Sequence, residues 1–187
     1  MRENKCLSGV TKNYLGRYSM ILDKMVSEMM GAELTDSLSH DFIVQMIPHH
    51  MAAIEMSHNI LKYTTFVPLQ NIASDIVTEQ TESIKKMRAL LDECGKIKNT
   101  QWDICMYREC YEQITQTMYC GMANARIVNN INADFMYEMI PHHEGAIRMS
   151  ENLLRFKICP GLVPVLDSII VSQRKGICEM QNLLKCV

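Results

Sequence analysis

One segment of the chain occurs twice, and this duplication constrains the fold more than any other feature. The pentapeptide Met-Ile-Pro-His-His begins at Met46 and begins again at Met139, 93 positions later. At that fixed offset and without a gap, 20 of the 52 residues in 40–91 have an identical counterpart. Repeats that cannot bury their own apolar faces usually bury them against each other. We therefore expect one domain made of two repeats, at about 12–93 and 103–186.

The size and composition of the chain fit a single soluble domain covering residues 1–187. A hydrophobic fraction of 48% and a charged fraction of 21% are normal for a globular protein of this length. The net charge of −2 comes with no basic stripe, which argues against nucleic acid as a partner. No apolar run is long enough to cross a bilayer. We expect no membrane partner, and the sequence leaves a homo-oligomer open.

The spacing of apolar residues predicts helices throughout the chain. Prolines and glycines are few, at five and eight, and no segment alternates apolar and polar residues with a period of two. The sixteen methionines suit helices and fill irregular cores. Six helices are expected, at residues 12–30, 38–63, 67–93, 103–124, 131–157 and 162–186. Four long helices, two from each repeat, would form a bundle around a pseudo-two-fold axis, with the shorter first helix of each repeat packed alongside.

The paired histidines fall on the apolar side of their predicted helices. At about 100° per residue, His50 lies within the apolar stripe of its helix and His49 lies at the edge of that stripe, next to Met56. The imidazoles are therefore expected to face the bundle interior beside thioether sulfurs. Pro48 and Pro141 precede the histidines inside the helical pattern, where proline kinks a helix. The kink either aims the histidines or is a harmless inherited bend.

The last helix of each repeat carries one polar residue in its apolar stripe. This residue is Gln80 in the first repeat and Gln173 in the second. A buried polar group without a partner costs about 1–3 kcal/mol, so each glutamine needs a hydrogen-bond partner. A ring N–H of a facing histidine is one candidate.

Histidine and methionine together indicate a soft metal ion. Thioether sulfur selects Cu(I), whereas imidazole suits copper, zinc, iron and nickel. A hard ion would require clustered carboxylates, and the only repeated ones are Asp41 and Asp134. Both aspartates lie on the polar side near a helix start, where they complement the helix dipole. Metal binding is favoured over the alternative that these side chains are ordinary core residues.

The cysteines and the N-terminus bear on the cellular compartment. None of the eight cysteines forms a C-x-x-C pair, and none matches a cysteine in the other repeat, so we expect free thiols of a cytosolic protein. The first five residues include the charged Arg2, Glu3 and Lys5, and no apolar segment follows them. We therefore expect a cytoplasmic protein, or an exported one if a leader has been removed.

The duplicated pattern resembles the family catalogued as domain of unknown function 305. The pattern runs from Asp41 to Met56 and from Gln80 to Leu91, and again from Asp134 to Met149 and from Gln173 to Leu184. The resemblance implies a ferritin-like four-helix bundle with two related halves. It also implies copper binding, with Cu(I) favoured and another transition metal as the alternative ion. The candidate ligands, matched position by position, are Met46, His49, His50, Met56, Met87, Met139, His142, His143, Met149 and Met180.

Three functions are compatible with these features. The leading hypothesis is a copper buffer or carrier without catalytic activity. A helical scaffold or interaction protein, with its histidines satisfied inside the core, is the first alternative. A ferritin-like di-metal oxidase is the second, and it requires inward-facing glutamates with Glu-x-x-His motifs. No glutamate is kept in the duplication, since Glu138 near His142 corresponds to Gln45, so we expect a protein that is not an enzyme.

Overall fold

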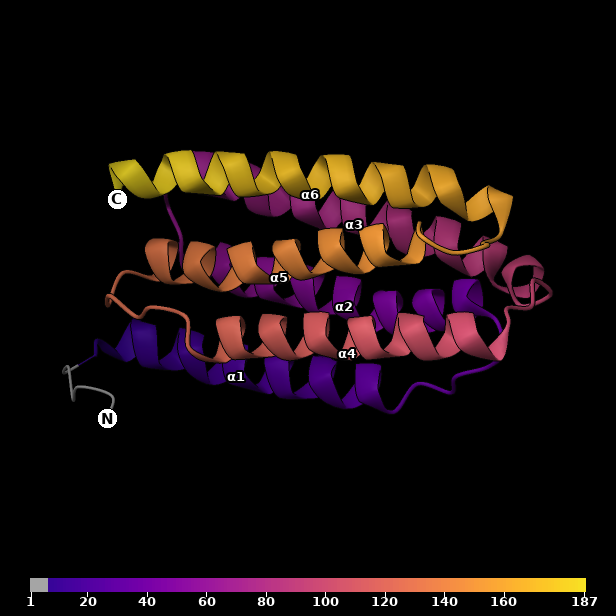
Figure 1. Cartoon of the computed structure of the whole chain (residues 1–187). Coiled ribbons are helices and arrows are strands. Elements are labelled where there is room, and N and C mark those ends of the chain that lie inside the picture. Colours follow the sequence, from indigo (N-terminus) through magenta and orange to yellow (C-terminus); the bar gives the residue numbers. More distant parts are fainter. Residues whose placement is uncertain (1–6) are drawn as a thin grey trace.

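The computed structural model describes residues 7–187, and every regular element in that range is a helix (Figure 1). In this part of the chain the six α-helices are α1 Gly9–Met30, α2 Leu38–Leu61, α3 Val67–Cys94, α4 Gln101–Ala123, α5 Ile131–Leu153 and α6 Val163–Leu183. The single-turn 3-10 helices Pro160–Leu162 and Leu184–Cys186 flank α6. The all-α prediction is confirmed, and each expected helix lies close to its expected position.

Local sequence signals explain where the helices begin. The Ser37 side chain accepts a hydrogen bond from the backbone N–H of His40 at the start of α2, and Thr100 caps α4 through Asp103 in the same way. Such caps satisfy backbone donors that have no partner within the helix. Helices α3 and α6 begin without a side-chain cap, but each has a proline in its first turn. Proline is favourable there because its missing N–H would be unpaired anyway.

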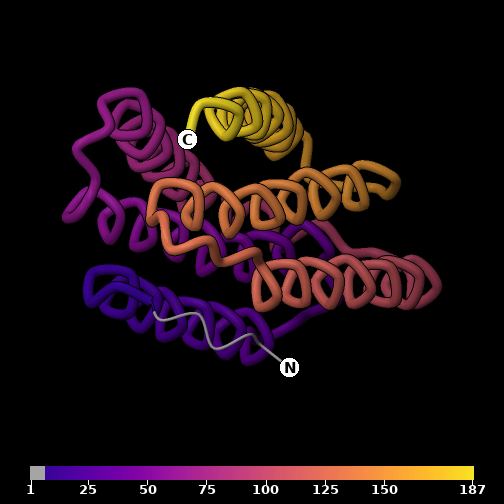
Figure 2. Tube along the Cα trace, turned by 90° about the vertical axis from the view of Figure 1, so that its left-hand side faces the viewer, coloured from indigo at the N-terminus to yellow at the C-terminus, as the bar shows by residue number. Residues whose placement is uncertain are grey.

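The helices form three layers of two, and each layer pairs equivalent helices of the two repeats (Figure 1). Helices α2 and α5 make the middle layer and contact each other. Helices α3 and α6 pack on one side of that layer, and α1 and α4 pack on the other, as the end view in Figure 2 also shows. The middle helices, which carry the repeated histidines, are therefore covered on both faces.

Helices α2, α3, α5 and α6 form the expected four-helix bundle. The flanking helices α1 and α4 are not short, since they contain 22 and 23 residues against 21 for α6. Each of them has a buried stripe that extends over most of its length, from Thr11 to Met29 in α1 and from Ile104 to Met122 in α4. Their length follows from the need to cover the middle layer.

The polar side of α2 is buried beneath α1 and does not face solvent. Asp41 and Asn59 are only 1% and 2% exposed. The Asn59 side-chain amide donates a hydrogen bond to the backbone carbonyl oxygen of Tyr14 at 3.1 Å, and Asn152 donates to Tyr107 at the same distance in the second repeat. These paired contacts attach each flanking helix to the middle layer, so polar residues here serve packing and not solvation.

The two repeated aspartates hold the loops that precede α2 and α5. Asp41 accepts a hydrogen bond from the backbone N–H of Thr35 at 2.7 Å, and Asp134 accepts one from Val128 at 2.7 Å. Arg108 of α4 adds an ion pair with Asp41 at 2.8 Å. The carboxylates at the helix starts are thus used by the fold, in keeping with their predicted structural role.

A glycine in α5 provides the space for a buried methionine of α4. A Cβ atom added at Gly145 would lie 2.2 Å from the sulfur of Met118. One turn earlier in α5, Pro141 lies 3.0 Å from the position that a Cβ at Gly121 of α4 would occupy. Helices α4 and α5 therefore approach each other closely because two glycines lack side chains.

This close approach predicts that Gly145→Ala destabilises the protein, although alanine normally favours a helix. The added methyl displaces Met118, and overpacking of this kind costs about 1–3 kcal/mol. Gly16→Ala is the control, since Gly16 lies within α1 and a Cβ there meets nothing within 4 Å. That change should stabilise the protein by about 0.5–1 kcal/mol. Urea unfolding of both variants measures the two effects, and a stabilised Gly145→Ala variant would contradict the close packing.

Candidate metal centre

The equivalent histidines of the two repeats stack on each other where α2 contacts α5. The ring centroids of His49 and His142 are 3.6 Å apart, and the ring planes are inclined by 29°. His142 Nε2 donates a hydrogen bond to the backbone carbonyl oxygen of His49 at 3.1 Å. Since the two residues are 93 positions apart, the pseudo-two-fold axis passes between their rings. The duplication therefore brings the two motifs together at the centre of the molecule.

The neighbouring histidines extend this pair into four imidazoles, His50, His49, His142 and His143, here called the histidine row. The ring centroids of His49 and His50 are 5.9 Å apart, and those of His142 and His143 are also 5.9 Å apart. None of the four side chains is more than 2% exposed. The expectation that the histidines face the interior is thus met by all four.

Helices α2 and α5 supply the histidine row, and both contain a proline just before it. Pro48 and Pro141 lie inside these helices, which continue past them without a break. The Pro141 side chain also forms the close contact with α4 at Gly121. That the prolines aim the imidazoles stays a prediction.

The outer histidines contact α3 and α6 at equivalent positions of the two repeats. His50 Nε2 lies 3.2 Å from Ser83 Oγ on α3. The counterpart of Ser83 is Gly176 on α6, where an added Cβ would lie 3.0 Å from the His143 ring. His50 therefore has a hydroxyl partner, whereas His143 occupies the space that a side chain on α6 would need.

The expected pairing of Gln80 with a histidine is not formed. Both amide atoms of Gln80, which is 2% exposed, have no hydrogen-bond partner within the described residues. Ser83, nearly one turn further along α3, contacts the His50 ring instead. The helical stripe identified the face of α3 that meets the histidines, but it did not identify the contacting residue.

Several nitrogen atoms of the histidine row are buried without a partner. In the part of the chain that the structure describes, these are His49 Nδ1 and Nε2, His50 Nδ1, His142 Nδ1 and His143 Nδ1. A buried polar atom that lacks a hydrogen bond costs about 1–3 kcal/mol. Such groups in a native interior require an explanation, and an ion is one of the usual ones.

Burial keeps the imidazoles neutral at pH 7. Removal from water lowers the pKa of His50 to about 3 and that of His142 to about 4. Burial, reinforced by the neighbouring histidines, also lowers the pKa of His49 and His143 well below the ordinary value of 6.5. A neutral imidazole has one nitrogen lone pair free for coordination. The histidine row is therefore in the protonation state that a metal ligand requires.

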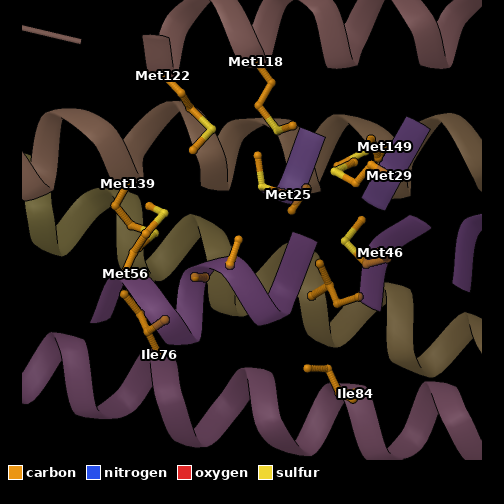
Figure 3. Close-up of a cluster of buried hydrophobic side chains, with 14 of the residues drawn as sticks. Met25, Met29, Met46, Met56, Ile76, Ile84, Met118, Met122, Met139 and Met149 are labelled. Atoms are coloured by element: carbon orange, nitrogen blue, oxygen red, sulfur yellow. The ribbon is translucent and has the colours of Figure 1, made fainter. Parts of the chain in front are cut away.

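A cluster of buried methionines contacts the middle layer on the side of α1 and α4 (Figure 3). The labelled methionines are Met25, Met29, Met46, Met56, Met118, Met122, Met139 and Met149, and none is more than 3% exposed. Four of these, Met46, Met56, Met139 and Met149, are ligand candidates from the sequence. The sequence also proposed Met87 and Met180, which are buried in α3 and α6, outside the group that Figure 3 labels.

The flanking helices contribute methionines that the sequence-based ligand set omitted. Met25 and Met29 belong to α1, and Met118 and Met122 are their counterparts in α4 at the same offset of 93. The shared offset of 93 is the sequence signal that could have added these methionines to the ligand set.

The thioethers form two groups related by the repeat. In Figure 3, Met29, Met46 and Met149 are drawn toward one end of the cluster. Their counterparts gather at the other end and are Met122, Met139 and Met56. Each group combines one methionine of α2 and one of α5 with one of a flanking helix. The duplication thus produces two sets of soft donors and not a single one.

Neither the described carboxylates nor the histidines of the row form a metal site of three or more such ligands by themselves. Within residues 7–187, no three or more histidine, cysteine, aspartate or glutamate side chains have an arrangement that could hold a metal ion. The buried Glu138 carboxylate instead accepts a hydrogen bond from the Tyr14 hydroxyl at 2.5 Å, and burial raises its pKa well above 4.5. The glutamate cluster that a di-metal oxidase requires is not found in this part of the chain.

The cysteines of the described region are free thiols. Cys94 and Cys159 are buried, and Cys110 is half-buried. The remaining described cysteines are exposed and are Cys105, Cys120, Cys178 and Cys186. The expectation of free thiols holds for these residues, whereas Cys6 lies outside the described residues.

Comparison with known proteins defines the family. A profile of the domain of unknown function family DUF305 matches residues 16–91 and 39–184. The chain therefore belongs to the DUF305 family, as its duplicated motif indicated. The uncharacterized protein L153 of Acanthamoeba polyphaga mimivirus is 42% identical over 93 residues, which are 49% of this chain. The aligned part spans 58% of the length of that relative.

Solved structures share the fold. A DUF305 fragment from Deinococcus radiodurans matches 80% of this chain and 97% of its own with a TM-score of 0.58 and 23% identity. CopM in a silver-bound form obtained by soaking matches 82% of this chain and 97% of its own, with a TM-score of 0.58 and 27% identity. CopM co-crystallised with silver matches 79% of this chain and 95% of its own, with a TM-score of 0.57 and 26% identity.

Among the helices described for this chain, none is long and apolar enough to cross a membrane.

The lowered pKa of His142 predicts a defined pH dependence of stability. As pH falls, the unfolded chain binds a proton near pH 6.5, whereas folded His142 binds one only near pH 4. Stability is therefore lost as pH falls through this window. His142→Phe keeps a ring against His49 but cannot titrate. The free energies of unfolding of the metal-free variant and the metal-free parent should therefore diverge by about 1.4 kcal/mol per pH unit. Urea unfolding from pH 7 to 4 measures this, and parallel curves would contradict burial of a neutral His142.

Proposed function

We propose that this protein binds Cu(I) through the histidine row and the adjacent methionines, and that it acts as a copper buffer or carrier. The observation that carries the proposal is the set of buried, neutral ring nitrogens that have no partner among the described residues. They lie in a core that also contains buried thioethers. Imidazole and thioether together are ligands that favour Cu(I).

The charge of the ligands favours a monovalent ion. The imidazoles are neutral at pH 7, and thioethers carry no charge at any pH. A divalent ion would bring two positive charges into the interior, and removing charge from water costs several kcal/mol per ion unless opposite charges compensate it. The buried carboxylates of Asp41 and Asp134 are already engaged by loop N–H groups. Cu(I) therefore fits this ligand set better than Zn²⁺ or Cu²⁺.

The relationship to CopM supports the same class of ion. CopM, at 26–27% identity, has been crystallised in silver-bound forms. Ag(I) is a soft monovalent ion, and thioether and imidazole donors suit such ions. The silver-bound forms of a protein with this fold therefore support a soft monovalent ion as the ligand of this chain.

Thiols would compete for Cu(I), so the test uses a variant that keeps only the buried Cys94 and Cys159. Its substitutions to serine are at Cys6, Cys105, Cys110, Cys120, Cys178 and Cys186, and it is here called the serine background. Cu(I) affinity is then measured by competition with a chromophoric Cu(I) chelator.

Replacement of the stacked histidines should weaken Cu(I) binding in the serine background. His49→Gln with His142→Gln removes two donors at the centre of the row, and we expect a loss of at least about tenfold in affinity, equivalent to about 1.4 kcal/mol. His58→Gln is the matched control, since His58 is an exposed histidine of the same helix α2. A double variant that binds Cu(I) as tightly as the control would refute the proposal and favour a scaffold with core histidines.

The thioethers are tested by a second pair of variants. Met56→Leu with Met149→Leu removes one sulfur from each methionine group while keeping side-chain volume, which leaves stability within about 1.5 kcal/mol. We expect Cu(I) affinity to fall by at least about threefold, because a soft donor is lost from each site. Met20→Leu with Met30→Leu is the control, as both residues are exposed, at 62% and 76%. Equal affinity of the two double variants would mean that copper is held by histidine alone.

A further inference from the structure

A cavity lined partly by polar side chains connects the histidine row with the surface between α3 and α6. The cavity has a volume of about 300 Å³. Its lining includes His50 from the row, Gln80 and Ser83 from α3, and Gln173 and Ser168 from α6. Figure 1 places these two helices in the layer opposite α1 and α4. The opening therefore lies on the face of the middle layer that the methionine cluster does not occupy.

Two repeat-equivalent glutamines line this cavity without hydrogen bonds to the protein. Gln80 and Gln173 are 2% and 3% exposed. Among the described residues, neither amide atom of Gln80 has a partner, and Gln173 Oε1 has none. Leucine at these positions would continue the apolar stripe of each helix and avoid the loss of about 1–3 kcal/mol for an unpaired polar group. The glutamines are therefore polar residues at cavity-lining positions where leucine would suit the apolar stripe.

The two ends of the histidine row differ in access. The recess that reaches His143 has a volume of only about 10 Å³. The recess and the larger cavity are both lined by Glu79 and Ser172. Because these two residues are repeat equivalents, the two openings lie on either side of the pseudo-two-fold axis. The His143 ring packs against Gly176 and fills this side. Within the described residues, the larger opening to the row is thus at the His50 end.

We propose that the cavity is a loading port, in which an incoming Cu(I) ion that carries small ligands exchanges them for His50. This inference rests on the proposed function. About 300 Å³ corresponds to roughly ten water molecules, so the cavity holds an ion together with one or two small ligands. In the exchange, a bond from Cu(I) to its carrier ligand breaks and a bond to a His50 nitrogen lone pair forms, with no change of oxidation state. The ion then passes along the row to His49 and His142.

The port is tested by the rate at which the serine background takes Cu(I) from its chelator complex in a stopped-flow instrument. Ser168→Trp places a large side chain at the exposed mouth of the cavity. Asp75→Trp is the matched control, because Asp75 is the repeat equivalent of Ser168, is also exposed, and lines the smaller recess. We expect loading to slow by about tenfold in Ser168→Trp and to stay unchanged in the control, with equal equilibrium affinity in both.

A second variant tests the port without blocking it. Gln80→Leu with Gln173→Leu removes the unpaired amides, so the variant should be at least as stable as the parent in urea unfolding. It should nevertheless load Cu(I) more slowly, because two of the polar side chains that line the cavity are lost. A purely structural role of the glutamines would give the reverse, with lower stability and an unchanged loading rate.

The outcomes separate the port from the function. Unchanged loading in Ser168→Trp, or equal slowing in Asp75→Trp, with Cu(I) affinity intact, would overturn the port and leave copper binding standing. Absence of histidine-dependent Cu(I) affinity in the serine background would overturn both. Slower loading in Ser168→Trp and in the glutamine variant, with the control unaffected, supports the port.

Discussion

The stacking of His49 on His142 is the contact on which the rest of the structure depends. Two imidazoles at a centroid distance of 3.6 Å cannot both carry a charge, because repulsion between like charges is strong in a buried site. Their neutrality follows from complete burial, which lowers the pKa of both. Burial in turn requires three layers of helices, since a single bundle of four would leave one face of α2 and α5 in water. The neutrality of the two stacked rings therefore depends on the three-layer arrangement of the helices.

The two faces of the middle layer have different properties. The side covered by α1 and α4 contains the thioethers, packed closely enough that Gly145 must lack a side chain beside Met118. The side covered by α3 and α6 is looser and more polar, with the cavity at His50. The methionines of α1 and α4 and the cavity thus lie on different sides of the middle layer, whereas Met87 and Met180 are buried in α3 and α6, on the side of the cavity.

The two repeats have diverged around a shared set of donors. The histidines and the paired methionines have kept their identity at the offset of 93, whereas the residues that contact them have not. Ser83 of the first repeat corresponds to Gly176 of the second. Gln45 corresponds to Glu138, and only Glu138 accepts a hydrogen bond from a tyrosine. These differences make the pseudo-symmetric centre unequal at its two ends. A duplicated site with one open end suits directed loading better than a symmetric one.

The helices and their pairing were predictable from the sequence because periodicity and a gapless duplication report directly on local structure and symmetry. The burial of Asp41 and Asn59 was not, since a polar side chain on a helical wheel looks solvent-facing until a partner such as Tyr14 covers it. The partner of His50 was also missed, because a wheel gives the face of α3 and not the register that places Ser83 at the ring. Met25 and Met118 resembled ordinary core residues, and only the layered arrangement brings them beside the motif.

X-ray absorption at the copper edge tests the central claim most directly, with Cu(I) bound to the serine background. Donation by imidazole and thioether groups predicts a shell that contains both nitrogen and sulfur neighbours, with the outer-shell scattering of imidazole rings. The His49→Gln, His142→Gln variant should lose that ring scattering. A shell of oxygen neighbours alone, or a spectrum unchanged by the histidine substitutions, would contradict coordination by the histidine row.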